Sequence, residues 1–133
     1  MNFKKRLFIT LSFVLMAAAI SCKKDRSGAA HDALANSTWK GTFVVKNNGP
    51  DPLSVKFSGN KEAALFFGDL NAPPEHQGKG SYTFTNNKLL FSVTDYYNEK
   101  MSFAGTLTNH TITGTWGHGN ADNGGGSFTI TRQ

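Results

Sequence analysis

The sequence has few of the residues from which catalytic and metal centres are built. Its 133 residues include one cysteine, which excludes an intramolecular disulfide and a cluster of thiolate ligands. We find no serine elbow, no zinc signature and no phosphate-binding loop in it. No segment shows the 3.6-residue period of an amphipathic helix. We therefore expect a protein that is not an enzyme and that needs no metal and no cofactor.

The chain also lacks a concentrated basic region in its main part, although its formal charge is +5. Lys4, Lys5 and Arg6 contribute three of the positive charges, and residues 23–26 contribute two more. Residues 34–133 carry eight basic and seven acidic side chains, so this part is almost neutral. We therefore expect no nucleic-acid partner, because binding to phosphate backbones requires clustered Lys and Arg.

The amino-terminal segment has the pattern of a cleaved secretory signal. The basic start is followed by an apolar run over residues 7–20, interrupted only by Thr10 and Ser12. These 14 residues are too few to cross a bilayer as a helix, which needs about 20. Small residues then lead to Cys22, the single cysteine.

Residues 21–25, Ser-Cys-Lys-Lys-Asp, resemble the end of a lipoprotein signal of the Bacteroidota type. In that family the cysteine becomes the first mature residue and carries acyl chains, and two or more chains anchor a protein stably. The resemblance implies a signal peptide at 1–21, a lipidated tether at 22–35 and attachment of Cys22 to the outer membrane, in either leaflet. The alternative is a soluble secreted protein whose signal ends near a cysteine.

After Asn36 the chain has the period-two pattern of strands with one buried face. Apolar residues alternate with Thr, Ser and Lys in seven segments, and a shorter apolar run makes an eighth strand. Turn residues, mostly Asn and Gly, separate nearly all of them. The predicted strands cover residues 39–46, 53–58, 63–67, 81–85, 88–94, 101–108, 111–116 and 127–131, with a long loop at 68–80.

Eight short strands joined mostly by hairpins predict an antiparallel meander. An open meander would leave one apolar face and two edges exposed, whereas closure into an up-and-down barrel covers both. We therefore predict an all-β, eight-stranded barrel over residues 36–133, and we expect a monomer. A two-sheet sandwich would give a similar alternation.

This region resembles the lipocalin-like, or calycin, barrels. Trp-Lys-Gly at 39–41 opens the first strand, Gly-Thr-Trp at 114–116 repeats a Gly–Trp motif, and Arg132 ends the last strand. The resemblance implies that Arg132 stacks on Trp39 where the barrel closes. It also implies an interior that holds a small or hydrophobic ligand.

The inward parity of the predicted strands is rich in aromatic residues. An eight-stranded barrel is just wide enough to be filled by side chains or to hold one small ligand, so both interpretations stay open. The residues concerned are Trp39, Phe43, Phe57, Tyr82, Phe84, Phe91, Phe103, Trp116 and Phe128.

Two functional hypotheses follow. The first is a lipid-anchored envelope barrel that binds a small or hydrophobic ligand among these aromatic residues. The second is an envelope interaction protein with a filled core, which binds a protein or polysaccharide, or acts as an inhibitor. Its contacts would be the outer face, the loops 68–80 and 117–126, or exposed side chains among Phe66, Phe67, Tyr96 and Tyr97.

The remaining polar candidates are weaker. His76, His110 and His118 fall in predicted turns or loops, where solvated histidines are expected. The glycine-rich loop 117–126 carries oxygen ligands of the kind that calcium prefers, but only one carboxylate, Asp122. We therefore interpret it as a hairpin loop.

Overall fold

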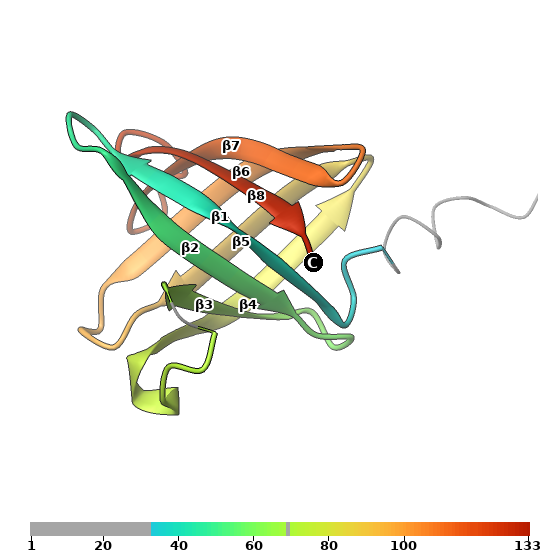
Figure 1. Ribbon diagram of the computed structural model, residues 1–133, viewed down its shortest axis with the longest axis horizontal. Helices are drawn as coiled ribbons and strands as arrows, with labels where there is room; N and C mark the ends of the chain where they lie inside the picture. The colour runs from blue at the N-terminus through green and yellow to red at the C-terminus, as the bar shows by residue number, and fades with distance from the viewer. Residues whose placement is uncertain (1–32, 69) are drawn as a thin grey trace, which may run out of the picture.

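The computed structural model describes residues 33–68 and 70–133; the predicted signal peptide, Cys22 and most of the predicted tether lie outside these residues. The described chain forms a closed barrel of eight strands with one short 3-10 turn (Figure 1). The elements are β1 (Ser37–Val45), β2 (Pro50–Phe57), β3 (Glu62–Phe67), η1 (Pro74–His76), β4 (Gln77–Thr85), β5 (Lys88–Thr94), β6 (Lys100–Thr108), β7 (Thr111–His118) and β8 (Gly126–Arg132).

Each strand pairs antiparallel with the next, and β8 pairs with β1 to close the barrel. The predicted eight-stranded antiparallel meander is therefore confirmed, and the alternative sandwich is not what the chain forms. The tight turn at Asn86-Asn87 has positive φ at both residues, 51° and 63°, which matches the twist of a two-residue hairpin.

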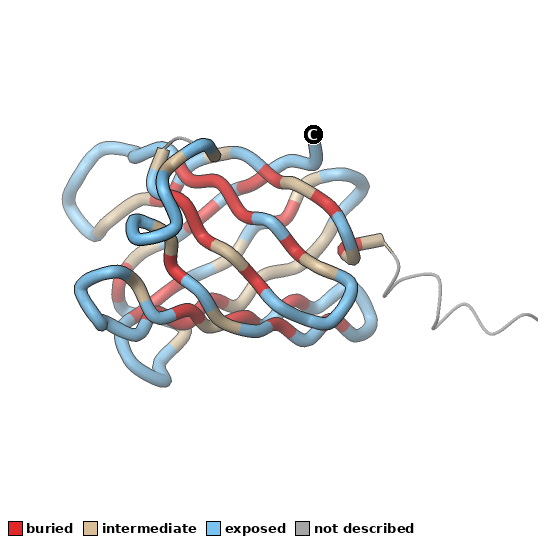
Figure 2. The backbone as a smooth tube through the Cα atoms, turned by 90° about the horizontal axis from the view of Figure 1, so that it is seen from below, coloured by how far each residue is buried: buried red, intermediate tan, exposed pale blue. Residues whose placement is uncertain are grey.

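The alternation of the sequence becomes the alternation of the barrel wall (Figure 2). In β5, Leu89, Phe91 and Val93 are buried, whereas Lys88, Leu90 and Thr94 are exposed. Successive side chains of a strand point to opposite faces, so one parity fills the interior and the other meets solvent. Closure buries the apolar parity of all eight strands at once.

Two glycines of the Gly–Trp motifs stand where neighbouring strands pass very close. A Cβ on Gly41 would lie 1.9 Å from the carbonyl oxygen of Thr129, and a Cβ on Gly114 would lie 1.9 Å from that of Ala104. No side chain fits at these distances, so only glycine allows the backbones to approach this closely. The motifs therefore have a structural explanation in the bending of the wall.

Several boundaries differ from the prediction: β2 already begins at Pro50, and β7 continues to His118, which the sequence placed in the glycine-rich loop. The predicted loop 68–80 is shorter, because β4 already begins at Gln77 and the segment just before it forms η1. Leu34, which the sequence places in the tether, is fully buried in the core. The folded unit therefore includes this residue, and a turn over residues 33–36 leads from it into β1.

The two ends of the barrel are different (Figure 1). We call the end at which Leu34 and the carboxyl end of β8 lie the tether end, and the opposite end the loop end. The tether end carries the connections 58–61, 86–87 and 109–110, and the loop end carries 46–49, 68–76, 95–99 and 119–125. Since the chain reverses at every connection, alternate connections necessarily gather at the same end.

Candidate functional site

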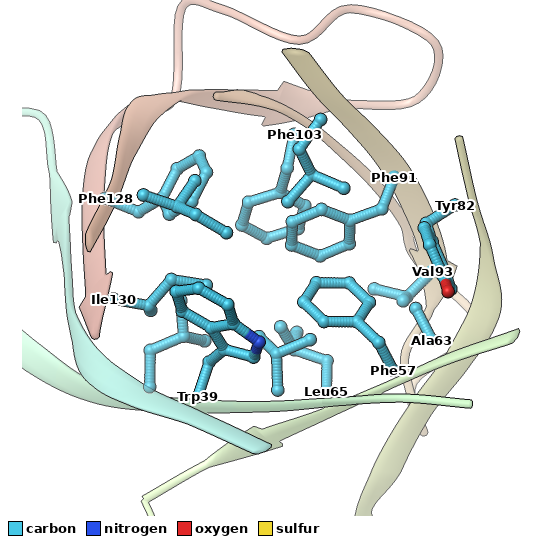
Figure 3. Close-up of a cluster of buried hydrophobic side chains, with 14 of the residues drawn as sticks. Trp39, Phe57, Ala63, Leu65, Tyr82, Phe91, Val93, Phe103, Phe128 and Ile130 are labelled. Atoms are coloured by element: carbon cyan, nitrogen blue, oxygen red, sulfur yellow. The ribbon is translucent and has the colours of Figure 1, made fainter. Parts of the chain in front are cut away.

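The predicted interior aromatic residues point toward one another (Figure 3). Phe91 and Phe103 stack face to face, with centroids 4.3 Å apart and planes at 3°. Phe128 meets the Phe103 ring edge-on at 5.5 Å, and Phe57 meets Phe91 edge-on at 5.8 Å. Edge-to-face and offset contacts at these distances are favourable for aromatic pairs.

The ring contacts continue toward both ends of the barrel. Phe57 contacts Tyr82 at 4.8 Å near the tether end, and Phe43 contacts Trp116 at 5.7 Å near the loop end. All nine predicted residues, Trp39, Phe43, Phe57, Tyr82, Phe84, Phe91, Phe103, Trp116 and Phe128, are buried in the core cluster. Their first role is therefore to pack against each other, and binding of a ligand among them stays a prediction.

Three hollows lie on the outer face of the wall. They measure about 270, 410 and 400 Å³, and outward-facing residues such as Ser81, Ala64 and Ala104 line them. They are open depressions, and Asn120 and Asp122 of the glycine-rich loop border the first of them.

The tether end is closed by its own residues. Leu34 inserts into the core, and the Ser37 hydroxyl donates a hydrogen bond to the Leu34 carbonyl oxygen. Ser37 Oγ in turn accepts a 2.8 Å hydrogen bond from the Trp39 indole N–H. The Asn36 side-chain oxygen accepts a 3.1 Å hydrogen bond from the Gly59 backbone N–H, which ties the β2–β3 turn to the same segment.

Trp39 and Arg132 are register partners where β8 closes onto β1. Trp39 is buried and Arg132 is exposed. The closure that the pair was expected to mark is present in the strand pairing, while stacking of the guanidinium on the indole stays a prediction.

The loop end carries an exposed aromatic cluster, which we call the aromatic rim: His76, Tyr96 and Tyr97. The Tyr96 ring lies between the other two, with centroids 4.1 Å from Tyr97 and 5.4 Å from His76. Tyr96 is 45% exposed and Tyr97 is 73% exposed. Two different connections, β3–β4 and β5–β6, therefore meet to form one surface.

The hairpin that carries the two tyrosines is held by Asp95. Its carboxylate accepts hydrogen bonds from the backbone N–H groups of Tyr97, at 2.9 Å, and Glu99, at 2.8 Å. Backbone bonds join Asp95 to Glu99 and to Asn98, whose φ of 64° completes the turn. An Asp that bonds to the following backbone in this way fixes a turn, so the rings are presented in an ordered geometry.

The Tyr96 hydroxyl interacts with its neighbours in the rim. A hydrogen bond with the Tyr97 side chain raises the pKa of the Tyr96 hydroxyl, and desolvation and the negative charges of Tyr97 and Asp95 act in the same direction. Tyr96 is therefore an uncharged hydrogen-bonding group at neutral pH.

Of the four side chains predicted as candidates for surface contacts, three are exposed and one is buried. Phe67, Tyr96 and Tyr97 are exposed, Phe67 by 36%. Phe66 is only 2% exposed, and the Lys56 ammonium covers its ring at 5.3 Å. The contact of His76 with Tyr96 was not predicted, because nothing in a single sequence relates two loops 20 residues apart.

The histidines and the glycine-rich loop do not converge on a site. His110 directly precedes β7 and His118 is its last residue, so the two lie at opposite ends of the barrel. The Asn120 side-chain oxygen accepts a 2.6 Å hydrogen bond from the Lys100 ammonium. Within residues 33–68 and 70–133, no group of three His, Cys, Asp or Glu side chains is placed to hold a metal ion.

No family model, curated protein or solved structure matches this chain. The described part of the chain contains no helix that is both long and apolar enough to span a bilayer.

Proposed function

We propose that this protein is a non-catalytic binding module of the cell envelope, anchored through a lipidated Cys22 to the outer membrane, and that it recognises a polysaccharide through its aromatic rim. The barrel is then a scaffold, and the rim at its loop end is the recognition surface. The observation that carries this proposal is the exposed pair Tyr96 and Tyr97, whose rings contact each other at 4.1 Å between centroids, on a hairpin ordered by Asp95.

Order in the rim favours binding. A side chain that is already held in its bound geometry loses little conformational entropy when a ligand docks. Tyrosine adds a large, rigid contact area with only two side-chain torsions, and its hydroxyl can donate and accept. The contact of Tyr96 with both neighbours limits its ring before any ligand arrives.

The composition of the surface favours a saccharide over a protein. Among the described residues the large exposed apolar side chains are Phe67, Leu90, Tyr96 and Tyr97, so aliphatic surface is nearly missing from the loop end. A stable protein interface buries about 800 Å² on each partner around an apolar centre. A small aromatic platform bordered by Asn98 and Glu99 suits a ligand with one apolar ring face and many hydroxyl groups.

The interior ligand hypothesis is weaker on the same observations. Its lining residues stack on one another at 4.3 to 6.3 Å between centroids. A ligand would have to separate these rings, and a densely packed core resists such a change. The second of the two hypotheses, an interaction protein with a filled core, is therefore the one we adopt.

The direct test is an array of neutral and acidic saccharides probed with the labelled protein. We expect a defined subset of glycans to bind, and we expect Tyr96→Ala/Tyr97→Ala to weaken that binding at least tenfold. Leu90→Ala is the matched control, because Leu90 is equally exposed at 52% but lies on the outer wall in β5. Binding to no saccharide, or equal binding by the double variant, would contradict the proposal.

A further inference from the structure

The charged side chains of the domain are segregated between the two ends of the barrel. Among the described residues, the half toward the tether end carries five cations and one carboxylate, Glu62. The half toward the loop end carries three cations and five carboxylates. The first set of cations is Lys40, Lys56, Lys61, Lys88 and Arg132; the second half holds Lys46, Lys79 and Lys100 with Asp51, Glu75, Asp95, Glu99 and Asp122.

Four of the five cations are exposed toward the tether end, and we call these four residues the basic face. Lys40, Lys61, Lys88 and Arg132 are all exposed, and Lys61 lies in the β2–β3 turn. The Lys88 ammonium donates a 2.9 Å hydrogen bond to the Thr106 hydroxyl, which is a neutral partner. The fifth, Lys56, leans over the Phe66 ring and is not counted in the face.

We propose that this basic face docks on the anionic headgroups of the membrane to which the protein is tethered, so that the aromatic rim points away from the bilayer. The inference rests on the lipid anchor of the proposed function. It adds the orientation of the domain, which no anchor alone would set.

The length of the chain before the barrel supports the membrane surface as the partner of the basic face. Eleven residues separate Cys22 from Leu34. Even fully extended they span at most about 40 Å, so a lipidated Cys22 keeps the domain near the headgroups. Leu34 enters the barrel at the tether end, so the face that the chain brings closest to the lipid is the basic one.

Charge complementarity then selects the orientation. Lys and Arg near a bilayer are attracted by anionic lipids within about a Debye length, roughly 8 Å at physiological salt. The loop end carries more carboxylates than cations, so the reversed orientation would bring like charges together. Attraction of the tether end to anionic lipid and repulsion of the loop end from it therefore favour the same orientation, although the domain as a whole is almost neutral.

The test uses the mature chain, from residue 22 onward, with Cys22→Ser, so that neither the apolar signal segment nor acyl chains mask weaker binding. Co-sedimentation is measured with vesicles of phosphatidylcholine alone and with 30% phosphatidylglycerol. We expect at least tenfold stronger binding to the anionic vesicles, lost at high salt. A tether-end variant, Lys61→Glu/Lys88→Glu/Arg132→Glu, should lose it, and a loop-end variant, Lys46→Glu/Lys79→Glu/Lys100→Glu, should keep it within about twofold.

The two triple variants change the net charge equally. A difference in their binding therefore reports where the charges lie and not how many there are. Equal loss in both, or equal binding of the parent chain to neutral and anionic vesicles, would overturn the inference. If charge reversal prevents folding, the neutral variant Lys61→Gln/Lys88→Gln/Arg132→Gln should still lose most of the binding. Failure of the anchor is read separately: a Cys22→Ser chain that stays in the membrane fraction of cells after a high-salt wash contradicts lipidation and leaves the vesicle result standing.

Discussion

The two ends of the barrel differ in how far their side chains are buried. At the tether end Leu34 fills the opening, and hydrogen bonds link Ser37 to Leu34 and Trp39 to Ser37. At the loop end the longer connections leave Tyr96 and Tyr97 largely in solvent. One end is thus built like a core and the other like a surface for contact. An otherwise regular barrel can therefore keep a stable body while it exposes rings that a folded domain normally buries.

The largest loss of stability should come from removing the Leu34 side chain, which fills the tether end. Leu34→Ala removes a fully buried side chain and should lower the free energy of unfolding by about 2–5 kcal/mol. Phe67→Ala at the loop end removes a larger side chain, but one that is 36% exposed, and should cost about 1–2 kcal/mol. Urea unfolding followed by tryptophan fluorescence measures both. Equal costs would show that the two ends are not stabilised differently.

The next effect concerns the order of the rim. Asp95→Ala removes the acceptor of two backbone hydrogen bonds and should cost about 1–2 kcal/mol of stability. It should also weaken saccharide binding, because the tyrosines lose their fixed turn. Asp95→Asn keeps a side-chain oxygen in the same position and is the control. If Asp95→Ala bound saccharide as well as the wild type, the rim would not depend on this turn.

The smallest effect lies at the tether end. The Tyr82 hydroxyl donates a 3.0 Å hydrogen bond to the Ser58 carbonyl oxygen, so Tyr82→Phe should cost about 1 kcal/mol at neutral pH. Burial raises the pKa of Tyr82. The folded state therefore keeps this proton to higher pH than the unfolded state, and stability falls as pH rises above about 10.

Tyr82→Phe tests whether ionisation of Tyr82 causes this loss of stability at alkaline pH. Because a phenylalanine side chain cannot ionise, Tyr82→Phe should lose less stability than the wild type between neutral and strongly alkaline pH, as measured by urea unfolding. Parallel pH profiles for Tyr82→Phe and the wild type would contradict the assignment.

Much of the barrel was predictable because the alternation of apolar and polar residues along each strand shows which of its faces is buried. In β5 the alternation of Leu89, Phe91 and Val93 with Lys88, Ser92 and Thr94 assigns the inner face without reference to any other strand, although Leu90 is apolar and exposed. Phe66 and Phe67 show where such local reasoning ends. Adjacent residues of a strand point to opposite faces, and the inward Phe67 is the exposed one because β3 ends there, whereas Lys56 covers the outward Phe66.

By itself, the sequence determined the number of strands, their antiparallel order, closure and the near neutrality of the domain, because period-two alternation and turn residues are local properties. The tertiary structure alone decided that Leu34 fills one end, that His76 meets Tyr96 at the other, and that Lys61, Lys88 and Arg132 lie toward the same end. These residues are far apart in the chain. They come together only because an antiparallel meander returns every second connection to the same end and the pairing of β8 with β1 fixes the ring.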